Sequence, residues 1–196
     1  MAKASEALST PPASLEALQG AVRKAGPGRP PIHLWNPPFC GNIDMRIARD
    51  GTWFYGGTPI GRPALVALFA SVLKREPERY VLVTPVEKVG ITVEDAPFVG
   101  VELAAGDGVL HVRTNVDDWV TVDAEHPLRF EPGEADGLKP YLRVRDDLWA
   151  LLRRPLFYEL VELGETRVLD GVTMFGVASG DTFFAMAPAE AIGFEP

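Results

Sequence analysis

Cysteine is nearly absent from this 196-residue chain, which contains only Cys40. A single cysteine cannot form a disulfide within the chain and is typical of a protein kept in a reducing compartment. Long apolar runs are missing too: the longest, residues 64–73, is about half of the roughly 20 residues that a membrane-spanning helix needs. The polar, proline-containing N-terminus lacks the apolar core of a secretory signal. We therefore expect a cytoplasmic protein without a membrane partner.

Positive charge is in deficit, with 19 lysine and arginine residues against 27 aspartate and glutamate residues and a net charge of −8. At long range this charge repels phosphate backbones, which argues against a nucleic-acid partner. Hydrophobic residues make up 46% and charged residues 23% of the chain, as in an ordinary soluble globular protein. A chain of this length can bury one large core or two small ones.

Recognised catalytic motifs are also lacking. The chain has neither a P-loop pattern nor a G-x-G-x-x-G after a predicted strand, and it has no G-x-S-x-G elbow for a serine nucleophile. The three histidines, His33, His111 and His126, lack metal-ligand spacing with each other or with Cys40. The sequence therefore assigns no catalytic residue, no metal ligand and no cofactor, and it leaves open whether the protein is an enzyme.

Composition divides the chain into an N-terminal arm and two domains. Residues 1–31 form the arm, with a short helix that begins near Ser14 and an extended linker from Gly26 to Pro31, where glycine and proline exclude a helix. We expect a first α+β domain over residues 32–115 and a second over residues 116–196.

The first domain is predicted to contain a hairpin, a helix and several strands. Asp50 and Gly51 readily adopt the positive φ angles of a tight turn, and Pro63 is typical of the first position of a helix, which Pro77 then ends. Apolar runs and apolar–polar alternation predict further strands on residues 80–84, 89–93, 98–103 and 109–114.

The rest of the chain repeats this order. Short strands at 119–122 and 128–130 precede a helix that begins at Pro140 and carries apolar residues at helical spacing as far as Leu152, and Pro155 ends it. Four more strands are predicted on residues 157–163, 166–169, 172–178 and 182–187. The sequence thus predicts an α+β fold of two similar domains, each with two strands, a helix and antiparallel strands, related by duplication with a period of about 75 residues.

Several motifs, in order, resemble one protein family. The run HLWNPPFCG from His33 to Gly41 is followed by DMRI at 44–47, DGTWFY at 50–55, LVTPVEK at 82–88 and VEDAPF at 93–98. The resemblance continues with Thr114, Asn115, Tyr141, Arg143 and Arg145. From His33 onward the chain is similar to a bacterial family of uncharacterised proteins, domain of unknown function twelve-eighty-five.

The resemblance implies a duplicated α+β core whose C-terminal half is superficially similar to pleckstrin-homology-like barrels. It also implies a cleft between the halves that holds a nucleotide-like ligand, with a role in signalling. The family has no established activity, so no catalytic residue is carried over to this sequence.

The residues suggest a site for an anionic ligand. Glycine amides, a helix N-terminus and Arg62 in the loop Gly56–Arg62 could hold a phosphate or carboxylate, although a strand-to-helix turn also needs glycine and proline. Arg143 could contact a phosphate or pair with Asp147 four residues later, and Trp35 could stack on a base or fill the edge of a core. The candidate ligand contacts are Trp35, Arg46, Arg62, Lys88, Asn115 and Arg143.

Acidic residues support a different hypothesis. Glu87, Glu94 and Asp95 lie at the ends of a predicted strand and could act as acid, base or magnesium ligands. They could equally be a solvated strand end. Cys40 could be a redox sensor beside Arg46 or a small buried hydrophobe.

Together these observations favour a non-catalytic module that binds an anionic, nucleotide-like small molecule between two related domains and signals its occupancy through their packing. Two alternatives stay open. One is an enzyme that acts on a phosphorylated metabolite, and the other is a protein-interaction module that uses an exposed strand edge or the N-terminal helix.

Overall fold

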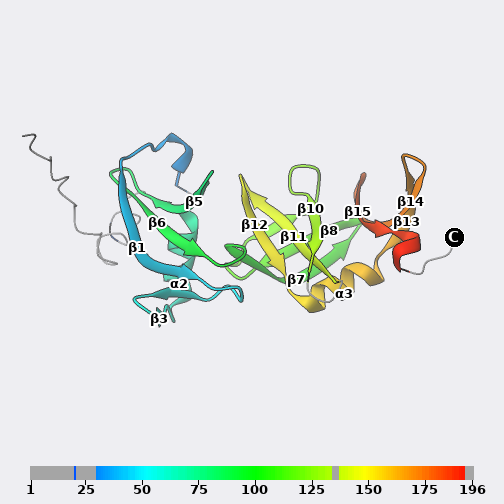
Figure 1. The fold of residues 1–196 in the computed structure, drawn as a ribbon, viewed down its shortest axis with the longest axis horizontal. Helices are drawn as coiled ribbons and strands as arrows, with labels where there is room; N and C mark the ends of the chain where they lie inside the picture. Colours follow the sequence, from blue (N-terminus) through cyan, green and yellow to red (C-terminus); the bar gives the residue numbers. More distant parts are fainter. Residues whose placement is uncertain (1–19, 21–29, 134–136, 193–196) are drawn as a thin grey trace, which may run out of the picture. The chain divides into compact units, whose positions relative to one another are not determined.

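The computed structural model describes residues 20, 30–133 and 137–192 and is mostly β, with two short α-helices (Figure 1). Contacts divide the chain into two units: the first extends to Ala48 and includes Thr52–Glu94, and the second contains Arg49–Gly51 and the chain from Asp95 onward. The predicted boundary after residue 115 differs, because residues 95–115 contain two strands of the second unit's sheet. The predicted N-terminal helix and most of the linker lie outside the described residues.

From residue 30 onward, the described part of the first unit contains one six-stranded mixed sheet and the α-helix α2. Its elements are the 3-10 helix η1 (Ile32–Leu34), β1 (Phe39–Ile47), β2 (Trp53–Tyr55), β3 (Thr58–Pro59), α2 (Pro63–Ser71), β4 (Leu73–Glu76), β5 (Arg79–Val83) and β6 (Lys88–Val93). The strand order is β3-β2-β1-β6-β5-β4, and only β1 and β6 run parallel.

Local signals placed the hairpin and the start of the helix in this unit. The predicted turn at Asp50 and Gly51 joins β1 to β2, with φ +86° at Gly51, and α2 begins at Pro63 as predicted. Phe69 of α2 is fully buried, and its ring stacks on that of Trp53 with centroids 6.4 Å apart. The packing of α2 therefore closes one face of the sheet.

The predicted extension of this helix to Pro77 is wrong. The helix ends at Ser71, and Leu73 instead begins β4 opposite Leu82 of β5. Pro77 lies in the turn between β4 and β5, where Glu76 pairs with Arg79. Leu73 is fully buried in this arrangement. An apolar residue at position 73 fits both the helical period of about 3.6 and the strand period of two, and pairing with β5 makes this segment a strand.

The second unit begins with another six-stranded mixed sheet. Its elements are β7 (Phe98–Gly106), β8 (Val109–Thr114), β9 (Trp119–Thr121), β10 (Leu128–Pro132), β11 (Leu138–Arg145), β12 (Leu148–Leu152), α3 (Arg154–Glu162), β13 (Glu165–Leu169), β14 (Val172–Ser179), β15 (Thr182–Pro188) and the 3-10 helix η3 (Ala189–Ile192). The strand order is β10-β11-β12-β7-β8-β9, and β12 runs parallel to β7. Strands β13, β14 and β15 form a separate antiparallel sheet.

The predicted helix from Pro140 to Leu152 is wrong, because this segment forms the hairpin of β11 and β12. The buried residues of β12 follow a period of two, at Leu148, Ala150 and Leu152. Leu142 and Val144 of β11 have the same spacing, although Tyr141, between Pro140 and Leu142, is buried as well. The acidic pair between the strands makes the turn, which places Asp146 at φ +43°. The apolar residues that suggested a helix belong to two strands that face one core.

The helix of the second unit instead occupies a segment for which a strand was predicted. Residues 157–163 fall mostly within α3, whose buried residues Leu156 and Leu160 are four positions apart. Pro155 lies in the first turn, where a missing amide proton costs nothing. Thus Pro155 begins a helix as Pro63 does, rather than ending one. Figure 1 shows α3 leading from the end of β12 towards β13.

The two six-stranded sheets have the same connectivity. Counted along the chain within each unit, both orders read 3-2-1-6-5-4, with strands 1 and 6 parallel. The first strands begin at Phe39 and Phe98 and the sixth strands end at Val93 and Leu152, so both pairs are 59 residues apart. The helices are not equivalent, since α2 joins strands 3 and 4 of its sheet whereas α3 follows strand 6. The predicted order of two strands, a helix and further strands therefore applies only to the first unit, where the two-residue β3 is added before α2. The offset of 59 residues replaces the predicted period of about 75.

A buried serine joins the three-stranded sheet to the larger sheet. Ser179 of β14 donates a hydrogen bond to the carbonyl oxygen of Val122 (2.6 Å) and accepts one from the amide of Leu110 (2.9 Å). Its exposure is 2%, so all three groups are shielded from water. Among the described residues, no helix has the length and hydropathy that crossing a bilayer requires.

Candidate functional site

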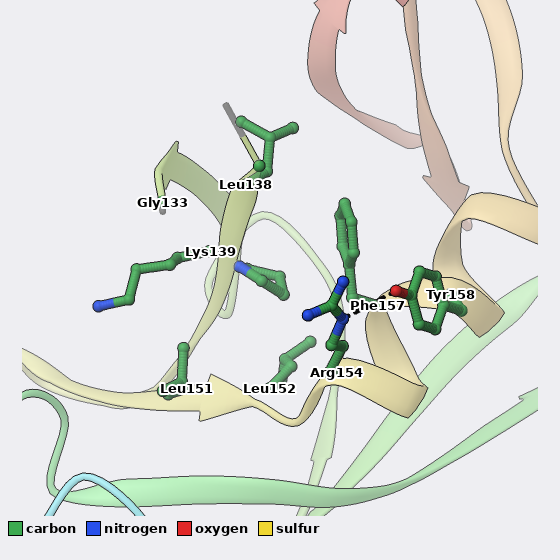
Figure 2. Close-up of a pocket in the computed structure, with 10 residues that line it drawn as sticks. Gly133, Leu138, Lys139, Leu151, Leu152, Arg154, Phe157 and Tyr158 are labelled. Carbon is green, nitrogen blue, oxygen red and sulfur yellow. Dashed lines mark hydrogen bonds between the residues drawn. The ribbon is translucent and has the colours of Figure 1, made fainter. Parts of the chain in front are cut away.

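A cavity lies in the second unit, where β11, the end of β12 and the first turns of α3 meet. It has a volume of about 490 Å³. Much of its lining is apolar and comes from Leu138, Pro140, Leu151, Leu152 and Phe157 (Figure 2). This volume and lining suit a small organic molecule better than a bare ion.

Arg154 brings positive charge to this cavity. It is the first residue of α3, its side chain is exposed, and its Nε donates a hydrogen bond to the hydroxyl oxygen of Tyr158 (2.7 Å). Figure 2 shows the guanidinium group beside Phe157 and Tyr158, which also line the cavity. Within the described part of the chain, no carboxylate forms an ion pair with Arg154. A guanidinium group at a helix N-terminus is suited to an anionic group.

The second cation of the lining, Lys139, is already neutralised. Its Nζ lies 2.5 Å from Oδ2 of Asp95 and 3.1 Å from the hydroxyl oxygen of Tyr141. Tyr141 in turn donates a hydrogen bond to Oδ1 of Asp95 (2.6 Å). Figure 2 shows the Lys139 amine pointing away from Arg154, so Lys139 contributes mainly its methylene groups to the cavity.

The three groups of this cluster shift one another's pKa values. Burial alone would raise the pKa of Asp95, but hydrogen bonds from Lys139 and Tyr141 and the charges of Lys139 and Arg49 outweigh it and lower that pKa. The hydrogen bond to Asp95 raises the pKa of Lys139. Burial, and then the bond to Asp95, raise the pKa of Tyr141. The ionised pair is therefore the stable form at neutral pH.

Comparisons with known proteins bear on what this chain is. Its residues 30–96 match the model described as the N-terminal domain of DUF1285, a domain of unknown function, and residues 97–186 match the C-terminal domain of DUF1285. The chain belongs to the DUF1285 family. The predicted resemblance is confirmed, and the junction of the two matches, after residue 96, lies close to the boundary between the structural units.

Two solved DUF1285 structures are similar to this chain. A protein from Silicibacter pomeroyi DSS-3 is 50% identical, with a TM-score of 0.82, over 91% of this chain and 97% of that one. A protein from Shewanella baltica OS155 is 30% identical, with a TM-score of 0.50, over 61% of this chain and 91% of that one. A comparison with curated proteins finds no significantly similar sequence.

Two of the predicted ligand contacts in this DUF1285 chain form ion pairs within the first unit. Arg46 pairs with Glu94, and its guanidinium carbon lies 4.2 Å from the centre of the Phe54 ring. Lys88 pairs with Glu76, with 2.7 Å between Nζ and Oε1. An anionic ligand would have to compete with these carboxylates for either cation.

Asn115 and Arg143 bind backbone groups in the second unit. The Asn115 side-chain oxygen accepts a hydrogen bond from the amide of Val99 (3.0 Å), and its side-chain nitrogen donates one to the carbonyl oxygen of Gly51 (3.3 Å). Nε of Arg143 donates to the carbonyl oxygen of Asp146 in the turn between β11 and β12. Both side chains thereby hold local structure.

Arg62 lines a smaller cavity, which lies in the first unit and has a volume of about 320 Å³. The glycines before it have a structural use: Gly56 (φ +55°) and Gly57 (φ +73°) form the tight turn between β2 and β3. The amide of Gly56 already donates to the carbonyl oxygen of Asp44. Trp35 is half-buried directly after η1.

The acidic residues that suggested an enzyme form no metal centre. Glu94 and Asp95 are held by Arg46 and Lys139, respectively. Across the described ranges, no three histidine, cysteine, aspartate or glutamate side chains lie close enough together to hold a metal ion. The half-buried thiol of Cys40 donates to the carbonyl oxygen of Pro38 (3.6 Å).

Sequence reasoning missed Arg154, Phe157 and Tyr158 because it predicted a strand at residues 157–163. The usable signal was Pro155 in the first turn of α3, with Leu156 and Leu160 on one helical face. The same rule identified the helix that begins at Pro63.

Proposed function

We propose that this DUF1285 protein is a non-catalytic module that binds a small anionic molecule with an apolar or aromatic part, in the cavity beside Arg154. The observation that carries the proposal is the Arg154 guanidinium group, which borders an apolar cavity of about 490 Å³ and forms no ion pair with a described carboxylate. The anion would bind to Arg154 and the first turn of α3, and the apolar part would contact Phe157 and Pro140. A nucleotide-like ligand fits this description.

Thermal unfolding with three probes tests the ligand class. Adenosine monophosphate carries a ring and a phosphate, benzoate carries a ring and a carboxylate, and inorganic phosphate carries no ring. We expect the first two probes to raise the Tm more than phosphate does, with or without magnesium. A ligand at 100 times its Kd adds about 2.7 kcal/mol to the free energy of unfolding, which corresponds to several degrees. An equal response to all three probes would contradict an amphipathic site.

Substitution of Arg154 tests the location. In Arg154→Ala the rise in Tm caused by the probe should disappear, because the group that binds the anion is lost. Arg75→Ala is the matched control, since Arg75 stacks on Tyr80 in the first unit, outside this cavity. Arg62→Ala tests the smaller cavity in the same way. An unchanged response in Arg154→Ala would remove the proposal, and a loss confined to Arg62→Ala would move the site to the first unit.

We also propose that the two six-stranded sheets arose by duplication. The shared strand order and the common offset of 59 residues support this origin. The matching tripeptides Phe39-x-Gly41 and Phe98-x-Gly100 at the starts of β1 and β7 have the same offset. The similarity of the C-terminal half to pleckstrin-homology-like barrels, and a role in signalling, remain predictions from the family resemblance.

A further inference from the structure

The outer edge of the three-stranded sheet in the second unit is open. β13 (Glu165–Leu169) pairs with β14 on one side, and no described strand pairs with its other side (Figure 1). All five of its residues are exposed. Unpaired strand edges attract other strands, and proteins usually protect them with charged side chains, proline or a bulge. β13 contains no proline, its register with β14 is regular throughout, and its two charged residues, Glu165 and Arg167, are of opposite sign and pair with each other.

Apolar side chains gather at the two ends of this edge. Val168 and Leu169 at the end of β13 are 69% and 41% exposed, and Val172 at the start of β14 is 50% exposed. Leu163, just before β13, is 46% exposed. Contiguous exposed apolar residues beside an open strand edge are typical of a surface that another chain covers.

The charges of β13 identify the occupant. Glu165 and Arg167 lie two positions apart and therefore project from the same face, and their side chains form an ion pair 2.6 Å long. When two identical strands pair antiparallel about a two-fold axis, the axis must pass through a residue that faces its own copy. An axis at Thr166 sets Glu165 of each copy opposite Arg167 of the other.

Neighbouring registers are unfavourable. An axis at Glu165 or at Arg167 would place that charge directly opposite the same charge, which destabilises a strand pair. The axis at Thr166 also brings Leu169 of each copy towards Leu163 of the other, so the apolar residues at opposite ends of the edge meet. The pairing of Glu165 with Arg167 and the meeting of Leu163 with Leu169 thus favour the same register, with the axis at Thr166.

We propose that the occupant of this edge is a second copy of the chain, and that two copies pair antiparallel along β13 about a two-fold axis at Thr166. In the six-strand sheet formed in this way, Leu169 of each copy lies beside Leu163 of the other, and Val168 lies opposite Gly164. This surface is distinct from the cavity beside Arg154, so the dimer and the ligand proposal stand or fall separately.

A charge-reversal series on the full chain tests the pairing, with mass measured by light scattering and sedimentation at moderate ionic strength. Glu165→Arg places two arginines opposite each other in each half of the interface, and Arg167→Glu places two glutamates there. We expect the wild-type chain to be dimeric and each single variant to dimerise at least about tenfold more weakly. Mixing the two single variants should restore a dimer, since each arginine of one then faces a glutamate of the other.

Each single variant also loses the ion pair between residues 165 and 167 of its own chain, and mixing does not restore that pair. A dimer regained on mixing therefore reports contacts between the two chains in this register. Glu102→Arg is the matched control: it makes the same change in net charge on β7, where Glu102 pairs with Arg113, and should leave the dimer intact. A monomeric wild-type chain at high micromolar concentration would overturn the proposal. So would a dimer that both single variants retain, or single variants that fail to associate when mixed.

Discussion

Single polar side chains bind strands and turns of the second unit together by satisfying buried backbone groups. Asn115 does this with both ends of its amide, at Val99 and at Gly51. The close approach also explains the glycine at 51, because a Cβ there would lie 2.7 Å from the Asn115 nitrogen and 2.8 Å from a methyl group of Val99. A candidate ligand contact is thereby explained as a structural residue.

Asn115→Ala should lower the free energy of unfolding by about 1–3 kcal/mol, because the amide of Val99 and the carbonyl of Gly51 lose their partner. Urea denaturation measures the effect. Asn36→Ala is the control, since Asn36 is exposed and should change stability by less than about 0.5 kcal/mol. If both variants are equally stable, the amide does not anchor these groups.

The cluster of Asp95, Lys139 and Tyr141 should make stability depend on pH at both ends of the range. Asp95 has a pKa below its ordinary 3.8 in the folded chain, so it stabilises the fold above about that pH, and this contribution is lost as the pH falls through the folded pKa. Lys139 has a pKa above its ordinary 10.5, so its contribution is complete below that pH and is lost as the pH rises through the folded pKa.

Asp95→Asn should therefore have a lower free energy of unfolding than the wild type between about pH 3.8 and pH 10.5. This difference in stability should become smaller as the pH falls below that range. Chemical denaturation at several pH values measures this difference. Glu102→Gln, which breaks an exposed ion pair with Arg113, is the control and should cost at most about 1 kcal/mol. A difference for Asp95→Asn that stays constant down to the lowest measurable pH would show that the carboxylate is not the stabilising group.

At the scale of elements, a glycine sets the shape of the small sheet. The register of β14 and β15 shifts between Phe175 and Gly176, and Gly176 is buried at the shift. A Cβ at this position would lie 2.2 Å from the carbonyl oxygen of Phe184, a backbone atom that cannot swing away. The irregularity thus depends on the absence of a side chain.

Gly176→Ala should accordingly destabilise the protein by about 1–3 kcal/mol or more, through overpacking against β15. Gly106→Ala is a matched control, because Gly106 also lies on a strand but a Cβ there would meet no described atom within 4 Å. Thermal unfolding of both variants provides the comparison. Equal Tm values would mean that β15 moves aside at little cost.

At the scale of the whole molecule, the same six-stranded connectivity is used twice with different additions. In the first unit α2 connects the two halves of the sheet, whereas in the second the halves are joined by the short segment between β9 and β10 and a helix follows the last strand. This later helix contributes Arg154, Phe157 and Tyr158 to the cavity and leads into β13. The proposed ligand site and the proposed dimer edge therefore both depend on elements that follow the six-stranded sheet in the second unit: α3 for the cavity and β13 for the edge.

The sequence by itself determined the positions of the turns and of most strands. Asp50–Gly51 lies in a tight turn, as predicted. Asp107–Gly108 and Asp170–Gly171 are the same dipeptide, and both turns have positive φ angles at both residues. These features depend on the backbone freedom of a few adjacent residues, which a sequence states directly. The family motifs were equally readable, because they are runs of adjacent residues.

Only the tertiary structure decided between helix and strand at residues 138–152, where the apolar residues suit both periods and burial against β7 and β10 selects strands. It also decided which charges meet: Arg46 reaches Glu94 across 48 positions and Lys139 reaches Asp95 across 44. Such pairs depend on strand order and register, which arise from the cooperative packing of the whole sheet rather than from local preference. For that reason the sequence singled out Arg46, Lys88 and Arg143, which the fold engages with Glu94, Glu76 and the backbone. It missed Arg154, which the fold places beside the apolar cavity.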